Sequence, residues 1–84
     1  HEFMASSLRR TMKYETSRRL IGQVAYAYGA CLKVEVLPSA EGFYIGTRED
    51  GLPFSRESVE FYPSCAAAQR ALRRRTWTQR LLAA

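Results

Sequence analysis

The C-terminal part of the chain carries the side chains best suited to contact a charged partner. Residues 64–84 include five arginines and no acidic residue, and these arginines are Arg70, Arg73, Arg74, Arg75 and Arg80. Trp77 lies among them. Guanidinium groups pair with phosphates and an indole can stack on a nucleobase, so this composition favours nucleic acid as the partner. Tryptophan and arginine are also common anchors of protein interfaces, which leaves a protein partner as the alternative.

A helical wheel predicts how these side chains are arranged. At about 100° per residue, an uninterrupted helix puts Ala68 and Leu72 on one side and Trp77 on the other. The arginines that share the side of Trp77, and that we expect to form a contact surface with it, are Arg70, Arg73, Arg74 and Arg80. In the alternative, the helix breaks near Arg75 and Trp77 folds back onto the core. The arginines are then a solvated face that complements the negative end of the helix dipole.

A second basic group precedes the apolar part of the chain. Arg18 and Arg19 fall in the first turn of an expected helix, where positive charge opposes the helix dipole. Free amide groups at a helix N-terminus favour an anion, and Arg9, Arg10 and Lys13 lie just upstream. We expect Arg18 and Arg19 to add a second contact with the partner. In the alternative, they are an exposed pair beside a mobile arm.

The chain lacks the residues on which most catalytic and metal sites depend. Its only histidine, His1, belongs to a segment ahead of Met4 that resembles the remnant of an expression vector. Histidine is the usual general base near neutral pH and the commonest metal ligand. Cys31 and Cys65 form no Cys-x-x-Cys pair, so we expect two reduced, buried, structural thiols. We therefore predict a binding protein that is not an enzyme and that uses no metal or cofactor.

Two helices are expected to flank the middle of the chain. Thr16 or Ser17 can cap a first helix that ends at Gly29. Its apolar residues recur at helical spacing, and they are Leu20, Ile21, Val24, Ala25 and Tyr28. Pro63 and Ser64 are typical of a helix start, so we expect the arginine-rich helix to begin at Cys65.

Three strands are expected between the helices. Residues 32–36 and 43–48 alternate with a period of two, as strands with one buried face do, and Pro38 with Ser39 separates them. Asp50 and Gly51 suit a tight hairpin turn, and a third strand follows from about residue 54 to residue 62. The side chains expected in the core are Leu20, Val24, Tyr28, Leu32, Val34, Val36, Phe43, Ile45, Val59, Phe61, Ala68 and Leu72.

The outward face of the predicted sheet carries charges of both signs. The residues expected there are Lys33, Glu35, Tyr44, Arg48, Arg56, Glu60 and Tyr62. Acidic neighbours repel phosphates, so we expect cross-strand ion pairs on this face rather than a surface that reads nucleic acid.

This order of elements predicts one α+β domain over residues 14–84, with a three-stranded antiparallel meander and two helices packed on one face. We expect residues 1–13 to be the vector remnant and a flexible basic arm. The order α-β-β-β-α resembles that of double-stranded RNA-binding domains, and its last four elements resemble the DNA-binding arms of phage and transposon integrases. The last helix begins with Cys65 and three alanines where the RNA-binding domains usually carry lysines, so the resemblance implies a fold and no function.

The charge of the chain is compatible with these partners. The formal net charge is +5, and it is concentrated towards the two ends while residues 20–63 are acidic overall. No apolar run reaches the roughly 20 residues that cross a bilayer, so we expect a cytoplasmic protein without a membrane partner. The leading hypothesis is a small module associated with nucleic acid. The alternative is a protein-binding regulator or inhibitor, of the kind that mobile elements encode in bacteria and phages, which acts through the tryptophan and arginine face or as a homodimer.

Overall fold

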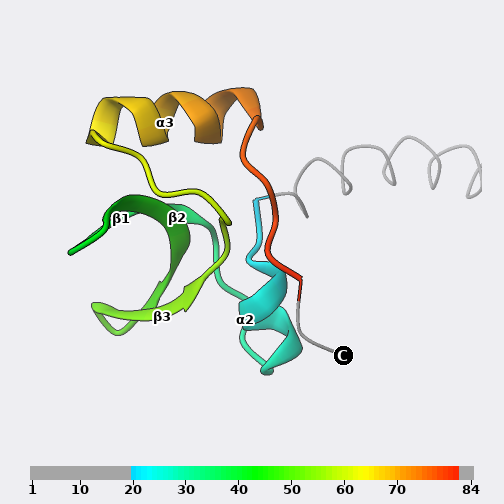
Figure 1. The fold of residues 1–84 in the computed structure, drawn as a ribbon. Helices are drawn as coiled ribbons and strands as arrows, with labels where there is room; N and C mark the ends of the chain where they lie inside the picture. Colours follow the sequence, from blue (N-terminus) through cyan, green and yellow to red (C-terminus); the bar gives the residue numbers. More distant parts are fainter. Residues whose placement is uncertain (1–19, 82–84) are drawn as a thin grey trace, which may run out of the picture.

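The computed structural model describes residues 20–81, in which two helices flank a three-stranded sheet (Figure 1). The elements are α2 (Gln23–Ala27), β1 (Glu35–Ser39), β2 (Gly42–Glu49), β3 (Leu52–Arg56) and α3 (Cys65–Arg74). The strands pair antiparallel in the order β1-β2-β3. The predicted α+β class and its order of elements, α-β-β-β-α, are therefore confirmed.

α2 is shorter than the first helix predicted from the sequence. Residues 20–22 are extended and pair antiparallel with residues 32–34, through backbone hydrogen bonds of 2.7 and 2.8 Å. An apolar pair such as Leu20 and Ile21 suits a helix or a strand equally, and this long-range pairing decides for the extended form. Gly29, with φ of 91°, follows the end of α2 as predicted. The caps expected at residues 16–17 lie outside the described residues.

The turn between β2 and β3 forms where the sequence predicts it. Asp50 and Gly51 have left-handed dihedrals, with φ of 54° and 80°. These are the values that a two-residue hairpin turn requires, and Glu49 and Leu52 pair across it.

β3 ends at Arg56, earlier than the predicted third strand. The backbone N–H groups of Glu57 and Ser58 both donate to the carbonyl oxygen of Ile45, at 2.8 and 2.9 Å. Two residues therefore face one, which is a β-bulge, and the chain leaves the sheet until Tyr62 pairs with β2 again. The bulge explains why the expected alternation of residues 54–62 fails after its first residues.

Each outer strand of the sheet carries a proline whose backbone faces away from β2. Glu49 and Leu52 close the hairpin turn as a hydrogen-bonded pair, so the nitrogen of Pro53 lies on the outer edge. The backbone of Ile45 faces the β3 side, and the same alternation therefore puts the nitrogen of Pro38 on the outer edge of β1. A proline has no N–H to offer, which discourages pairing with a strand of another molecule.

The main core lies between α3 and the sheet. α3 contributes Ala68 and Ala71, which are buried, and the sheet side contributes Val34 and Ile45. The partly buried side chains that pack against this cluster are Tyr62, Leu72 and Trp77. α3 contacts mainly β1 and β2, whereas α2 contacts β3.

Several assignments to the core, made from helical spacing or strand alternation, are wrong. Tyr28 and Val59 are 70% and 52% exposed, and Phe61 is also exposed. The helix that should have held Tyr28 inward ends one residue before it, and the bulge after Arg56 turns Val59 outward. Conversely, Tyr44 was expected outside and is buried, because Phe61 packs edge-on against its ring, with the ring centroids 6.0 Å apart.

Candidate nucleic-acid interface

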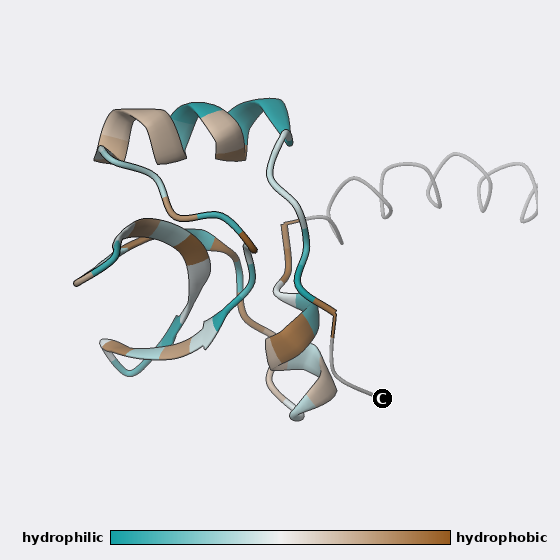
Figure 2. Ribbon diagram, viewed as in Figure 1, coloured by the Kyte–Doolittle hydropathy of each residue, from teal (hydrophilic) through white to brown (hydrophobic). Residues whose placement is uncertain are grey.

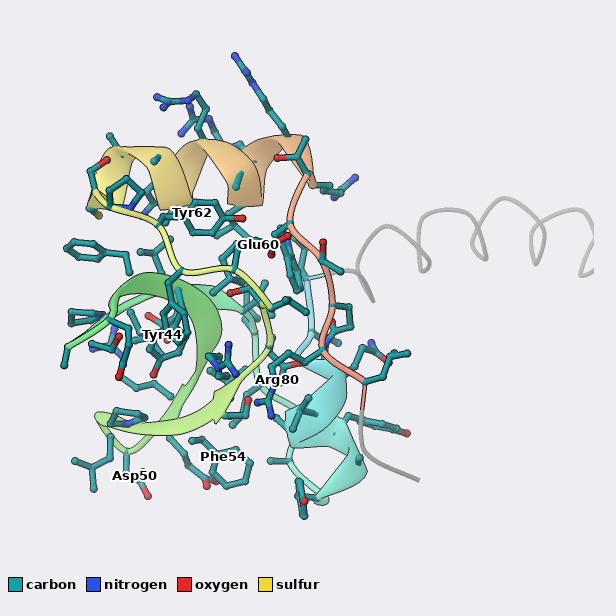
Figure 3. All side chains as sticks on the ribbon, in the orientation of Figure 1. Tyr44, Asp50, Phe54, Glu60, Tyr62 and Arg80 are labelled. Atoms are coloured by element: carbon teal, nitrogen blue, oxygen red, sulfur yellow. The ribbon has the colours of Figure 1, made fainter. Side chains whose placement is uncertain are left out.

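The outer side of α3 presents three arginines. The helix begins at the predicted place, because the side-chain oxygen of Ser64 accepts from the backbone N–H of Ala67 at 3.1 Å. With Ala68 and Ala71 buried, the helical repeat turns the arginines of the last two turns to the opposite side. These residues, which we call the arginine face, are Arg70, Arg73 and Arg74. All three are exposed, and Figure 3 shows nitrogen-ended side chains projecting from α3 away from the sheet.

The arginine face is free of opposing charge within residues 20–81. None of its guanidinium groups lies within ion-pair distance of an acidic side chain in this part of the chain. The one ion pair described there joins Arg48 to Glu35 at 2.6 Å, on the outward face of the sheet, as the sequence predicts. Figure 2 shows that the first turns of α3 are weakly apolar and that hydrophilic and apolar segments alternate in its second half. Among residues 20–81, the arginine face is thus a positive surface without a neutralising acidic partner.

Trp77 does not belong to this surface. α3 ends at Arg74, and Arg75 adopts a left-handed conformation with φ of 55° and ψ of 44°. The N–H of Thr76 then donates to the carbonyl of Ala71 at 3.0 Å, the pattern of a Schellman cap. The expectation of an uninterrupted helix is therefore wrong. Trp77 packs partly buried against the core cluster, as the alternative interpretation held.

Arg80 also lies elsewhere. One terminal nitrogen of its guanidinium group donates to the carbonyl of Arg56 at 2.9 Å, and its backbone N–H donates to the carbonyl of Glu57. Figure 3 shows Arg80 below α3, in the region between β3 and α2. Its contacts hold the C-terminal segment to the bulged edge, so a substitution there tests folding more than binding. Arg18 and Arg19 lie outside the described residues.

A buried carboxylate that the sequence analysis did not single out ties the fold together. Glu57 is fully buried, and its oxygens accept from the backbone N–H groups of Val24 and Ala25 at 2.9 and 3.0 Å. They also accept from the Ser55 hydroxyl at 2.6 Å and from the Gln79 side-chain amide at 2.7 Å. α2 has no side-chain cap of its own, so Glu57 supplies the acceptor that its first turn needs. No local signal reveals this role, since Val24 is 33 residues away.

The hydrogen bonds of Glu57 also decide its charge state. Burial acts to raise the pKa of this carboxyl, but the four hydrogen bonds outweigh burial and leave the pKa below its ordinary value. The side chain is therefore an ionised structural acceptor at neutral pH, with no free oxygen directed at a ligand.

A second carboxylate holds the segment that follows α3. The backbone N–H and the hydroxyl of Thr78 donate to Glu60 at 2.9 and 2.6 Å, and the N–H of Val59 donates to the carbonyl of Thr78 at 2.8 Å. Burial acts to raise the pKa of Glu60, but the hydrogen bonds from Thr78 outweigh it and lower the pKa. Residues 78–80 thus pair with the bulged edge instead of continuing α3.

The remaining candidates take structural places or lie on the surface. Arg56 packs over the ring of Phe61, with 4.7 Å from its guanidinium carbon to the ring centroid, and donates to the carbonyl of Ser58. Cys31 and Cys65 are exposed, so the expectation that both thiols are buried is wrong. Cys65 is the first residue of α3 and faces sideways, because Ala68 takes the buried side.

Within the described residues, no group of three His, Cys, Asp or Glu side chains could hold a metal ion. No helix in this part of the chain is long and apolar enough to span a bilayer. Comparison of the chain with models of known protein families, with curated proteins and with solved structures finds no match.

Proposed function

We propose that the protein is a small non-enzymatic binding module that associates with nucleic acid through the arginine face of α3. The observation that carries the proposal is the arrangement of Arg70, Arg73 and Arg74, which share one exposed side of a helix without an acidic neighbour in residues 20–81. Guanidinium groups make charge-assisted, often bidentate hydrogen bonds with phosphates. The proposed site no longer includes Trp77 or Arg80, because both serve the fold.

Binding of this kind depends strongly on salt. Each phosphate neutralised by an arginine releases counterions, so three contacts give a slope of about −2.7 for log affinity against log salt. We expect the affinity to fall about 40-fold between 50 and 200 mM salt by the same relation.

A pair of charge-matched variants tests the site. Arg73→Gln/Arg74→Gln removes two charges from the arginine face. Lys33→Gln/Arg48→Gln removes two exposed charges elsewhere, one from the segment before β1 and one from β2. Titration of a fluorescent DNA duplex at low salt should show weakened binding for the first variant and near-native binding for the second. Equal losses in both variants would show that net charge alone attracts the ligand, and absence of binding by the native chain would refute the proposal.

A second candidate function, a protein-binding regulator, draws on a different surface. Leu52 and Phe54 of β3 are 68% and 40% exposed, which is unusual for large apolar side chains in one short strand. Pro38 and Pro53 oppose dimerisation through the strand edges, so such a partner would contact side chains and not backbone. Light scattering on the native chain and on Leu52→Ser/Phe54→Ser tests self-association, which this candidate requires in its homodimer form.

We also propose that the protein resides in the cytoplasm. Cys31 and Cys65 are exposed and unpaired thiols, a state that a reducing compartment preserves.

A further inference from the structure

The arginine face reaches both flanks of α3. At about 100° per residue, the angular order around the helix is Arg73, Arg70 and Arg74, with about 60° and 40° between neighbours. Arg70 is therefore the middle side chain, and the other two lean to opposite sides of it. A surface that meets a single row of phosphates needs its cations along one line, whereas this surface spreads them across about 100° of arc.

Within residues 20–81, no other element covers the outer side of α3. Figure 1 shows α3 as the outermost element, with the sheet and α2 on one side of it and no described element on the other. Ala66 lies on the same side as Arg70, so the first turn carries only a methyl group on the side where the last two turns carry arginines. A helix of ten residues is about 15 Å long, and a helix with its side chains is about 10–12 Å wide.

These dimensions match one nucleic-acid surface. The major groove of B-form DNA is about 12 Å wide and admits an α-helix, and phosphates line it on both sides. We infer that α3 docks lengthwise in the major groove of double-stranded DNA, with Arg73 and Arg74 on phosphates of opposite strands and Arg70 facing the base edges. This inference rests on the proposed nucleic-acid function and names its ligand.

Other forms of nucleic acid fit the surface less well. Single strands are usually held by aromatic side chains that stack on bases, and the arginine face has none, since Trp77 packs partly buried on the core. The major groove of duplex RNA is deep and narrow and excludes a helix. Arg70 at the centre matches guanine, to which arginine makes its commonest specific contact.

The direct test compares three ligands of equal length under the same low-salt conditions, namely duplex DNA, single-stranded DNA and duplex RNA. We expect duplex DNA to bind at least tenfold more tightly than the other two. If single-stranded DNA or duplex RNA binds as tightly as duplex DNA or more tightly, the inference is overturned while the proposed function stays intact. Absence of binding to all three overturns both.

Single substitutions then separate the roles inside the face. The native chain should bind a duplex with guanine at its centre about tenfold or more tightly than one with adenine and thymine there. Arg70→Gln should bring the two affinities close to equality. Arg73→Gln and Arg74→Gln should weaken binding to both duplexes alike. Each should make the slope of log affinity against log salt less negative by about 0.9. Fluorescence of Trp77, the only tryptophan, reports whether each variant is folded. If the folded Arg70→Gln variant keeps the native guanine preference, the assignment of Arg70 to the base edges is wrong.

Discussion

The two charged regions of the molecule use charge in opposite ways. The arginine face places three exposed cations together without an acidic neighbour among residues 20–81, and its helix is held by alanines on the other side. The Glu57 carboxylate is fully buried, and four donors from α2, β3 and the C-terminal segment surround it. A charge whose hydrogen bonds are all made inside the protein stabilises the fold, whereas a charge exposed to water remains available to a ligand.

Removal of the buried carboxylate should have the largest effect. Glu57→Ala leaves the backbone N–H groups of Val24 and Ala25 without their acceptor. We expect a loss of about 3 kcal/mol in the free energy of unfolding, because each unsatisfied buried donor costs about 1–3 kcal/mol. Urea unfolding measures this loss. A variant as stable as the native chain would remove the contrast between the two regions.

Removal of the indole should follow in size. Trp77→Ala deletes a partly buried side chain from the core cluster, so we expect a loss of about 2 kcal/mol, below the roughly 3–5 kcal/mol of a fully buried tryptophan. Because Trp77 does not belong to the arginine face, the affinity for nucleic acid should stay within about twofold of native, which is less than 1 kcal/mol. This affinity is measured well below the unfolding temperature. A large loss of affinity in a folded Trp77→Ala variant would return this residue to the binding surface.

Gly22 offers a steric test of the Glu57 region. A methyl group at this position would lie 2.5 Å from a carboxylate oxygen of Glu57 and 2.6 Å from the methyl carbon of Thr47. We expect Gly22→Ala to cost about 1–3 kcal/mol, as overpacking of a core does. A Gly22→Ala variant as stable as the native chain would show that the space around Glu57 is not tight.

The pH dependence of stability should come from the same carboxylate. The pKa of Glu57 is lower in the folded than in the unfolded chain, so the folded state binds fewer protons in this range. The stabilisation is present above the ordinary glutamate pKa, near 4.5, and is lost as the pH falls through the lower folded value. Urea unfolding between neutral and acidic pH should show this decline, and Glu57→Gln should flatten it. Glu60 contributes in the same direction.

Changes on the arginine face should affect stability least. Arg73 and Arg74 lie in the last turn of α3, where each interacts with the helix dipole by about 0.3–1 kcal/mol. Together they contribute about 0.6–2 kcal/mol, so we expect Arg73→Gln/Arg74→Gln to reduce the free energy of unfolding by no more than this, even if nucleic-acid binding is strongly weakened. A larger loss, seen by thermal unfolding, would mean that these side chains also belong to the packing of the fold.

The features that the sequence determined by itself are local ones. The Asp50-Gly51 turn, the Ser64 cap and the alanine side of α3 each depend on residues within about one turn of each other. Strand alternation located β2 for the same reason. It was wrong about the bounds of β1, which runs from Glu35 to Ser39 and so includes Pro38 and Ser39, the residues predicted to separate the first two strands. The shared side of the arginine face could also be predicted from the sequence, since Arg70, Arg73 and Arg74 lie within five consecutive positions of one helix.

The tertiary structure decided what depends on residues far apart in the chain. Residues 20–22 are extended because residues 32–34 pair with them, and the C-terminal segment turns back because Glu57 and Glu60 supply its hydrogen-bond partners. That turn takes Trp77 out of the predicted surface and packs it, partly buried, against the core. A helical wheel or the period of a hydrophobic pattern describes one element in isolation. The end of α3 is instead set by hydrogen bonds to residues about 20 positions earlier in the chain.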